Sequence, residues 1–167
     1  MSERLLVDAM CGKLATYLRM CGYDAAYVLD PEDGAGTERT SESASTTESP
    51  SDADIAAWAE RSGRTLVTRD VDLAARVDDA VLLTSRDVVE QLDALYEAGF
   101  DLSLADPPRR CGACNGELGR VDADESLSSG MPDPAETACW RCRDCGQVFW
   151  KGSHWDDVRA TLAGVRK

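Results

Sequence analysis

The chain contains 167 residues, and 43% of them are hydrophobic, which is enough for one sizeable domain or for one domain with a small metal-stabilised unit. No stretch approaches the roughly 18 consecutive apolar residues that a membrane-spanning helix needs. The opening segment has a run of only three apolar residues, Leu5–Val7, before Asp8, which is too short for a signal peptide. These features predict a soluble, cytoplasmic protein that contacts no membrane.

Acidic residues outnumber basic residues by 31 to 18, the formal net charge is −13, and only three of the basic residues are lysines. An acid-rich, lysine-poor composition is typical of cytoplasmic proteins from salt-accumulating organisms, so we expect a halophilic protein. At molar salt the Debye length falls to about 3 Å. The net charge therefore does not exclude an anionic partner such as RNA.

The first hundred residues alternate between strand-like and helix-like patterns. Apolar residues at three- and four-residue steps predict helices, and Gly22 and Gly63 are placed to end two of them. Such alternation predicts an α/β fold with a mostly parallel sheet flanked by helices. The expected strands are 4–8, 26–29, 65–68 and 80–83, and the expected helices are 13–21, 54–62, 71–77 and one that Ser85 caps and Gly99 ends.

Two changes in composition divide the chain. In residues 33–51, nine of 19 residues are Ser or Thr, which predicts a flexible insertion. The Pro107-Pro108 pair ends the aliphatic pattern, and Cys, Gly and Trp dominate beyond it. We therefore expect an α/β domain over 1–104 and a small domain over 109–167, which closes with a helix at about 156–163.

The cysteines predict a metal site in the second domain. An odd count of seven argues against a disulfide framework. Two CxxC pairs, Cys111/Cys114 and Cys142/Cys145, are separated by 27 residues, which is typical of a zinc ribbon with a structural Zn²⁺. Cys139 also forms a CxxC pair with Cys142. We favour Cys145 as the fourth ligand, because Gly146 follows it as Gly112 follows Cys111.

A set of acids is placed for a second kind of site. Asp8 and Asp70 lie at the carboxyl ends of two predicted strands, Asp72 comes two residues after Asp70, and Asp52 precedes the helix expected from about Asp54. The carboxyl ends of neighbouring parallel strands meet at one edge of a sheet. Clustered carboxylates bind Mg²⁺ or Mn²⁺, and such ions support attack by water on a phosphodiester. The alternative is that Asp52 is a helix cap and that the other acids follow strands by chance.

The single histidine, His154, has two interpretations. A lone histidine can serve as a general base. The simpler interpretation, which we favour, is that Ser153 or His154 begins the last helix and packs against Trp150 and Trp155.

Three blocks of the sequence resemble a known family. They are LVDAMCGKLATYLRMCGYD at 6–24, GRTLVTRD at 63–70, and CRDCGQVFW at 142–150 followed by GSHW at 152–155. In this order they resemble the Mut-seven C-terminal RNase family, described as a PIN-like nuclease domain fused to a zinc ribbon. The resemblance implies metal-dependent RNA cleavage by acids, with phosphate-binding bases beside them. The implied acids are Asp8, Asp52 and Asp70, assisted by Asp72, and the implied bases are Lys13, Arg19 and Arg69.

The chain departs from the family pattern at several positions. Thr16 stands where an Arg is common, and Cys11 and Cys21 stand where aliphatic residues are usual. The second acid of PIN nucleases has no clear counterpart, since Glu38 lies in the insertion. We expect a ribonuclease whose ribbon helps to bind RNA. The alternative is a non-catalytic module on a decayed PIN-like domain, which binds RNA or an unidentified protein partner.

Overall fold

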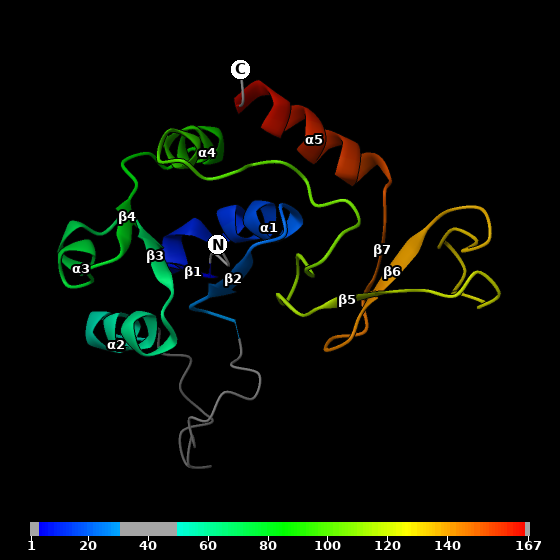
Figure 1. Cartoon of the computed structure of the whole chain (residues 1–167), viewed down its shortest axis with the longest axis horizontal. Coiled ribbons are helices and arrows are strands. Elements are labelled where there is room, and N and C mark those ends of the chain that lie inside the picture. Colours follow the sequence, from blue (N-terminus) through cyan, green and yellow to red (C-terminus); the bar gives the residue numbers. More distant parts are fainter. Residues whose placement is uncertain (1–3, 31–49, 166–167) are drawn as a thin grey trace, which may run out of the picture.

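The computed structural model of the chain describes residues 4–30 and 50–165, and Figure 1 shows how its elements are arranged. Glu38 and nearly all of the predicted insertion lie outside the described residues. The elements of the α/β part are β1 (Arg4–Val7), α1 (Gly12–Met20), β2 (Asp24–Tyr27), α2 (Asp52–Ser62), β3 (Thr65–Thr68), α3 (Val71–Ala75), β4 (Ala80–Leu82) and α4 (Val88–Glu97). The later elements are β5 (Leu118–Arg120), β6 (Cys139–Cys142), β7 (Val148–Trp150) and α5 (Ser153–Val165).

The first sheet has the strand order β2-β1-β3-β4, and every neighbouring pair is parallel. The predicted parallel sheet flanked by helices is therefore confirmed. After β1 the chain crosses to one side to form β2, and then returns to the other side of β1 to form β3. The point at which the strand order reverses thus lies between β1 and β3. Ligands of open α/β sheets bind at such a point, outside the carboxyl ends of the strands.

Alternation along the strands creates two cores. Leu5 and Val7 of β1 face one side of the sheet, where α1, α4 and α5 pack, and Leu6 faces α2 and α3 on the other side (Figure 1). All three side chains are fully buried. Successive side chains of a strand point to opposite faces, so a sheet covered on both faces needs a continuous apolar run such as Leu5–Val7.

Two elements differ from the sequence prediction for local reasons. Strand β2 spans 24–27 rather than 26–29, because Gly22, with φ of +90°, turns the chain directly into pairing between Asp24 and Arg4. Helix α4 is capped by Asp87, whose side chain accepts hydrogen bonds from two N–H groups of the first turn. Ser85, the predicted cap, lies two residues earlier and accepts the N–H of Asp87.

The second sheet is antiparallel, with the order β5-β6-β7, and carries a cysteine cluster compatible with a zinc ribbon. Helix α5 leaves this sheet and returns to the first one (Figure 1). Its residues Val158, Leu162 and Val165 are buried in the core shared with α1 and α4. Within the described residues, no helix has the length and apolar character needed to cross a membrane.

Candidate functional site

Four cysteine side chains converge in the second sheet. The Sγ atoms of Cys111, Cys114, Cys142 and Cys145 all lie within 4.8 Å of one another. Cys111 and Cys145 are 3.7 Å apart, and Cys114 and Cys142 are 3.4 Å apart. A tetrahedral zinc ion with Zn–S bonds of about 2.3 Å places its sulfurs about 3.8 Å apart. The four thiols therefore fit one zinc ion.

Two turns of similar shape present these thiols. In one turn the N–H of Asn115 bonds to the carbonyl of Cys111, and in the other the N–H of Gly146 bonds to the carbonyl of Cys142. Asn115 and Gly146 both have positive φ, +70° and +78°. The structural counterpart of Gly146 is thus Asn115. It is not Gly112, on which the preference for Cys145 was based.

The cluster contains Cys145 and leaves Cys139 out. Cys139 lies in β6, is fully buried, and directs its thiol to the carbonyl of Thr137 at 3.3 Å. A glycine is required beside the cluster, since a Cβ at Gly116 would lie 2.7 Å from Sγ of Cys142. The geometry therefore favours the Cys142/Cys145 pair over the Cys139/Cys142 pair as the second half of the cluster.

The backbone prepares one thiol for a metal. Burial raises the pKa of Cys111 and of Cys114. Burial also acts to raise the pKa of Cys142, but the N–H groups of Cys145 and Asp144 each lie 3.4 Å from its Sγ and lower that pKa to about 7. Zinc binds thiolates, so N–H groups that favour the thiolate also favour metal binding.

Asp8 is held rigidly where β1 ends. Its side chain is 7% exposed, and its backbone N–H bonds to the carbonyl of Val67 in β3. Oδ1 accepts the N–H of Ala9 at 2.7 Å, and Oδ2 accepts the hydroxyl of Thr68 at 2.6 Å. Both carboxylate oxygens of Asp8 are therefore fixed in position by hydrogen bonds.

Asp70 lies two residues beyond the end of β3. Its Oδ1 accepts the N–H groups of Asp72 and Leu73, which makes Asp70 the N-cap of α3. Both hydrogen bonds end on Oδ1, so Oδ2 takes no part in the cap. The N–H of Asp70 donates to the hydroxyl of Thr68 at 3.0 Å. Asp72 is exposed in the first turn of α3.

Asp52 is the first residue of α2 and is not its cap. Ser51 caps this helix, and its side chain and that of Asp54 form reciprocal hydrogen bonds with each other's N–H groups. The cap interpretation of Asp52 is therefore wrong. The carbonyl of Ser62 at the end of α2 accepts a hydrogen bond from Arg4 at the start of β1, so α2 ends at the amino edge of the sheet and its first turn, with Asp52, lies away from that edge.

The basic residues at the carboxyl edge of the sheet differ in how deeply they are buried. Nε of Arg69 is buried and has no hydrogen-bond partner among the described residues. Burial and the nearby charge of Asp8 raise the pKa of Cys11 to about 11, and the positive charge of Arg69 acts in the opposite direction. Asp8 and Arg69 therefore both lie close to Cys11. Lys13 is exposed in the first turn of α1.

Arg19 holds the fold together and does not face solvent. It is 3% exposed, and its guanidinium donates to the carbonyl oxygens of Ala25 and Gly112 and to Oδ2 of Asp30. These three bonds connect α1 to β2, to the loop after β2 and to the first cysteine turn. Each of the three guanidinium nitrogens therefore already donates a hydrogen bond within the protein.

The structure adds one acid to those expected from the sequence. Asp30 lies three residues beyond the end of β2, whereas Asp8 directly follows β1. Burial, then the charges of Asp30, Cys11 and Asp8, raise the pKa of Tyr27, so both acids act on this ring. The sequence signal was present, since Asp30 directly follows the apolar run that ends at Leu29.

The acids at this edge are spread out rather than gathered. Among the described residues, they do not form a group of three whose oxygens all lie within 4.8 Å of one another. Mg²⁺ is usually held by one or two carboxylates, with water and substrate phosphates completing its shell. Carboxylates of Asp8 and Asp70 on adjacent strands, beside the unpartnered Nε of Arg69, fit that arrangement with a phosphate present.

The fold and site define an α/β protein with an acidic strand edge and a four-cysteine cluster. Comparison with known protein families gives a match to the Mut7-C RNAse domain over residues 3–162. The chain belongs to this RNase-domain family, and the resemblance noted in the sequence is confirmed. Comparisons with curated proteins and with solved structures give no match.

Proposed function

We propose that this protein is a metal-dependent ribonuclease that hydrolyses RNA phosphodiester bonds at the carboxyl edge of its parallel sheet. One observation carries the proposal. The hydroxyl of Thr68 joins Asp8 to Asp70 at the point where the strand order reverses, in a chain of an RNase-domain family. Carboxylates fixed by hydrogen bonds at such a point suit a hard cation.

The acids have separate roles in this proposal. Asp8 and Asp70 bind Mg²⁺ or Mn²⁺, and Asp52 and Asp72 assist from the first turns of α2 and α3. Held there, Mg²⁺ or Mn²⁺ would activate a water molecule and neutralise charge on the phosphate. The second oxygen of Asp70 is the free ligand position, since the first caps α3.

The bases of the edge bind the substrate. Arg69 donates its buried Nε to a phosphate oxygen, which gives that atom the partner it lacks in the protein alone. Lys13 adds a second positive charge from the exposed surface of α1. Charge that develops on a phosphate is stabilised best by donors that are already in position. Arg19 has a structural role here, because its guanidinium bonds to Ala25, Gly112 and Asp30.

The cysteine-rich unit serves binding rather than chemistry. Its four thiols hold a structural zinc ion and leave no open position for water. We assign residues 1–104 to the nuclease domain and 109–167 to the ribbon with the closing helix, which returns to the nuclease core. The ribbon assists RNA binding from beside α1.

The test is cleavage of RNA by zinc-loaded protein, with and without Mn²⁺ and in dilute and molar KCl. Asp8→Asn removes the central carboxylate. The matched control is Asp79→Asn, because Asp79 also accepts a threonine hydroxyl, that of Thr65 at 2.7 Å, but at the opposite edge of the sheet. Loss of several kcal/mol of metal stabilisation lowers the rate about 100-fold or more.

We expect cleavage by the wild type and by Asp79→Asn only when Mn²⁺ is present, and none by Asp8→Asn. Cleavage by Asp8→Asn at the wild-type rate would reject the acidic site. Absence of cleavage by the folded wild type, together with RNA binding, would favour the non-catalytic module instead.

A further inference from the structure

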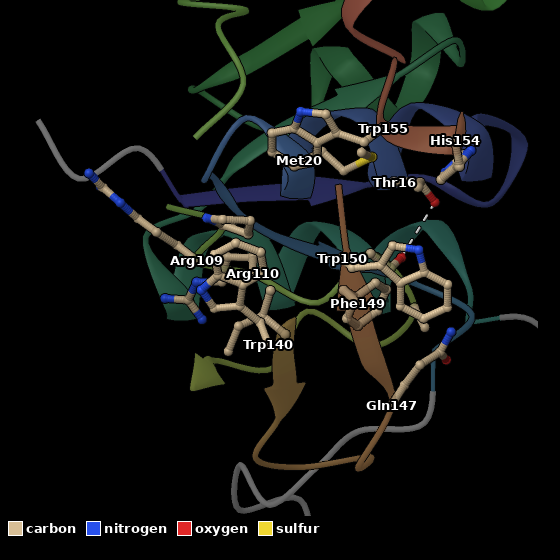
Figure 2. A pocket seen from close by; sticks show the side chains of 14 residues that line it. Thr16, Met20, Arg109, Arg110, Trp140, Gln147, Phe149, Trp150, His154 and Trp155 are labelled. Atoms are coloured by element: carbon tan, nitrogen blue, oxygen red, sulfur yellow. Dashed lines mark hydrogen bonds between the residues drawn. The ribbon is translucent and has the colours of Figure 1, made fainter. Parts of the chain in front are cut away.

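A cavity of about 330 Å³ lies between α1, the ribbon and the start of α5. Figure 2 shows its walls, in which Thr16 and Met20 come from α1, Trp140 and Trp150 from β6 and β7, and Trp155 from α5. Trp140 and Trp155 are 6% and 7% exposed, whereas Trp150 is 37% exposed. Two rings are thus fixed in the walls and a third is open to solvent.

A cationic side chain lies over each of the two buried rings. The guanidinium of Arg120 lies 5.5 Å from the ring centre of Trp140, and the ammonium of Lys151 lies 5.4 Å from that of Trp155. Both contacts are within the range in which a cation is attracted to an aromatic face. A ligand that enters the cavity therefore meets aromatic surface that is already ordered.

The charge of the lining is opposite to that of the protein. None of the described residues that line the cavity is acidic, although the chain carries 31 acids and a net charge of −13. The lining instead includes Arg109, Arg110 and His154, the single histidine of the sequence. Arg109 is exposed, while Arg110 donates to the carbonyl of Asn115 at 3.3 Å. Gln147 adds an amide that can both donate and accept.

We propose that this cavity binds one unstacked base of single-stranded RNA, with the neighbouring phosphate at Arg109. Aromatic rings stack on any base, and an amide and an imidazole can bond to its edge. A volume near the lower end of ligand pockets, about 300 to 1,000 Å³, suits one base with its ribose. Bases of a duplex are stacked and cannot enter, so the site selects single strands. This inference rests on the proposed function, since it names the form of RNA that the ribbon would hold.

RNA fits this lining better than a protein segment does. A strand of RNA supplies an aromatic ring and an anion at each nucleotide, which is the pairing that the tryptophans and Arg109 offer. An apolar peptide would use the rings but leave the basic residues without partners. A free mononucleotide carries the same base and phosphate as one residue of RNA. The experiment must therefore distinguish a free nucleotide from an RNA strand as the ligand of the cavity.

The experiment measures binding of a labelled single-stranded oligoadenylate to zinc-loaded protein by fluorescence anisotropy, with Asp8→Asn in every variant to prevent cleavage. Trp150→Ala removes the exposed ring, and Trp150→Phe retains an aromatic face and checks that the ribbon stays folded. Tyr96→Ala is the matched control, because Tyr96 is 41% exposed on α4 and does not line the cavity. Loss of one base–aromatic stack weakens binding about fivefold or more.

A second pair of variants tests the basic side chain. Arg109→Ala should weaken binding in dilute salt and have a smaller effect in molar KCl, since salt suppresses phosphate contacts. Arg86→Ala, an exposed arginine outside the cavity, should have no effect in either salt. The effect of Trp150→Ala should persist at both salt concentrations, because stacking does not depend on counterion release.

We expect weaker binding by Trp150→Ala, recovery by Trp150→Phe, and little binding of a duplex or of an abasic strand of the same length. Equal binding by Trp150→Ala, Arg109→Ala and their controls would overturn the cavity proposal, even if the wild type cleaves RNA. Adenosine monophosphate that binds as tightly as the strand would also overturn it in favour of a free nucleotide. Cavity-dependent binding without any cleavage by the wild type would uphold this proposal and reject the proposed ribonuclease.

Discussion

The hydroxyl of Thr68 donates a hydrogen bond of 2.6 Å to Oδ2 of Asp8, and the oxygen of that hydroxyl accepts the N–H of Asp70 at 3.0 Å. One fully buried side chain thus orients an acid on its own strand and an acid on the neighbouring strand. Threonine suits this position because its β-branched carbon favours a strand, while its hydroxyl can donate and accept at once.

Two replacements of Thr68 should distinguish the contribution of its branched shape from that of its hydrogen bonds. Thr68→Val keeps the branched shape but leaves a buried carboxylate oxygen and a buried N–H without their partner. We expect a loss of about 2 kcal/mol in the free energy of unfolding, measured with urea, and reduced RNA cleavage. Thr68→Ser retains the hydroxyl and should keep most of the activity. Equal cleavage by the two variants would show that the hydroxyl does not position the acids.

The zinc cluster predicts different outcomes for two neighbouring cysteines. Cys145→Ser removes a ligand of the four-thiol cluster, whereas Cys139→Ser changes a buried thiol outside it. We expect Cys139→Ser to retain one zinc ion per chain during a chelator challenge, and Cys145→Ser to lose it. Zinc release would be followed with a colorimetric indicator. The reverse order of zinc loss would assign the second ligand pair to Cys139 and Cys142.

Local sequence patterns predicted the structural features that depend only on residues close together in the chain. The run Thr65–Thr68 is apolar enough for a buried strand, and Asp70 follows it, so the strand and its acid could both be expected. The burial of Arg19 could not be expected, because it depends on the carbonyl of Gly112, 93 residues later. The return of α5 to the first core and the cavity beside Trp150 depend on similar long-range packing, which no local periodicity reveals.

Asn115 illustrates such a long-range contact and has a testable conformation. Its φ is +70°, Oδ1 accepts the N–H of Ala25 at 3.0 Å, and Nδ2 donates to Oδ1 of Asp24 at 2.7 Å. Asn115→Ala and Asn115→Gly both lose these bonds, but only alanine is strained at positive φ. We expect Asn115→Ala to be less stable than Asn115→Gly by about 1 kcal/mol in urea unfolding.

Gly146 provides the control for this conformational cost. It has φ of +78°, and a Cβ added there would meet no atom within 4 Å. Gly146→Ala should therefore lose about 1 kcal/mol through backbone strain alone. Equal stability of Asn115→Ala and Asn115→Gly, with Gly146→Ala destabilised, would show that the first turn adapts and the second does not.

Asp24 should make stability fall at acid pH. Burial acts to raise its pKa, but hydrogen bonds from Arg64 and Asn115 and the charge of Arg64 hold that pKa below its ordinary value of 3.8. Since the pKa is lowered on folding, the stabilisation is present above about pH 3.8 and is lost as the pH falls through the folded-state pKa. Asp24→Asn should cost about 2 kcal/mol near pH 7 and progressively less in acid. A stability difference that is constant with pH, measured by urea unfolding, would contradict this role.

The most direct test of the central claim is the position at which a divalent ion binds in the zinc-loaded protein. Fe²⁺ can replace Mg²⁺, and with ascorbate and peroxide it generates radicals that cut the backbone beside the bound ion. We predict cuts near Asp8 and Asp70 that excess Mg²⁺ suppresses, that Asp8→Asn abolishes, and that Asp79→Asn leaves unchanged. Cuts elsewhere, or cuts near Asp8 that persist in Asp8→Asn, would contradict a metal site at the carboxyl edge of the sheet.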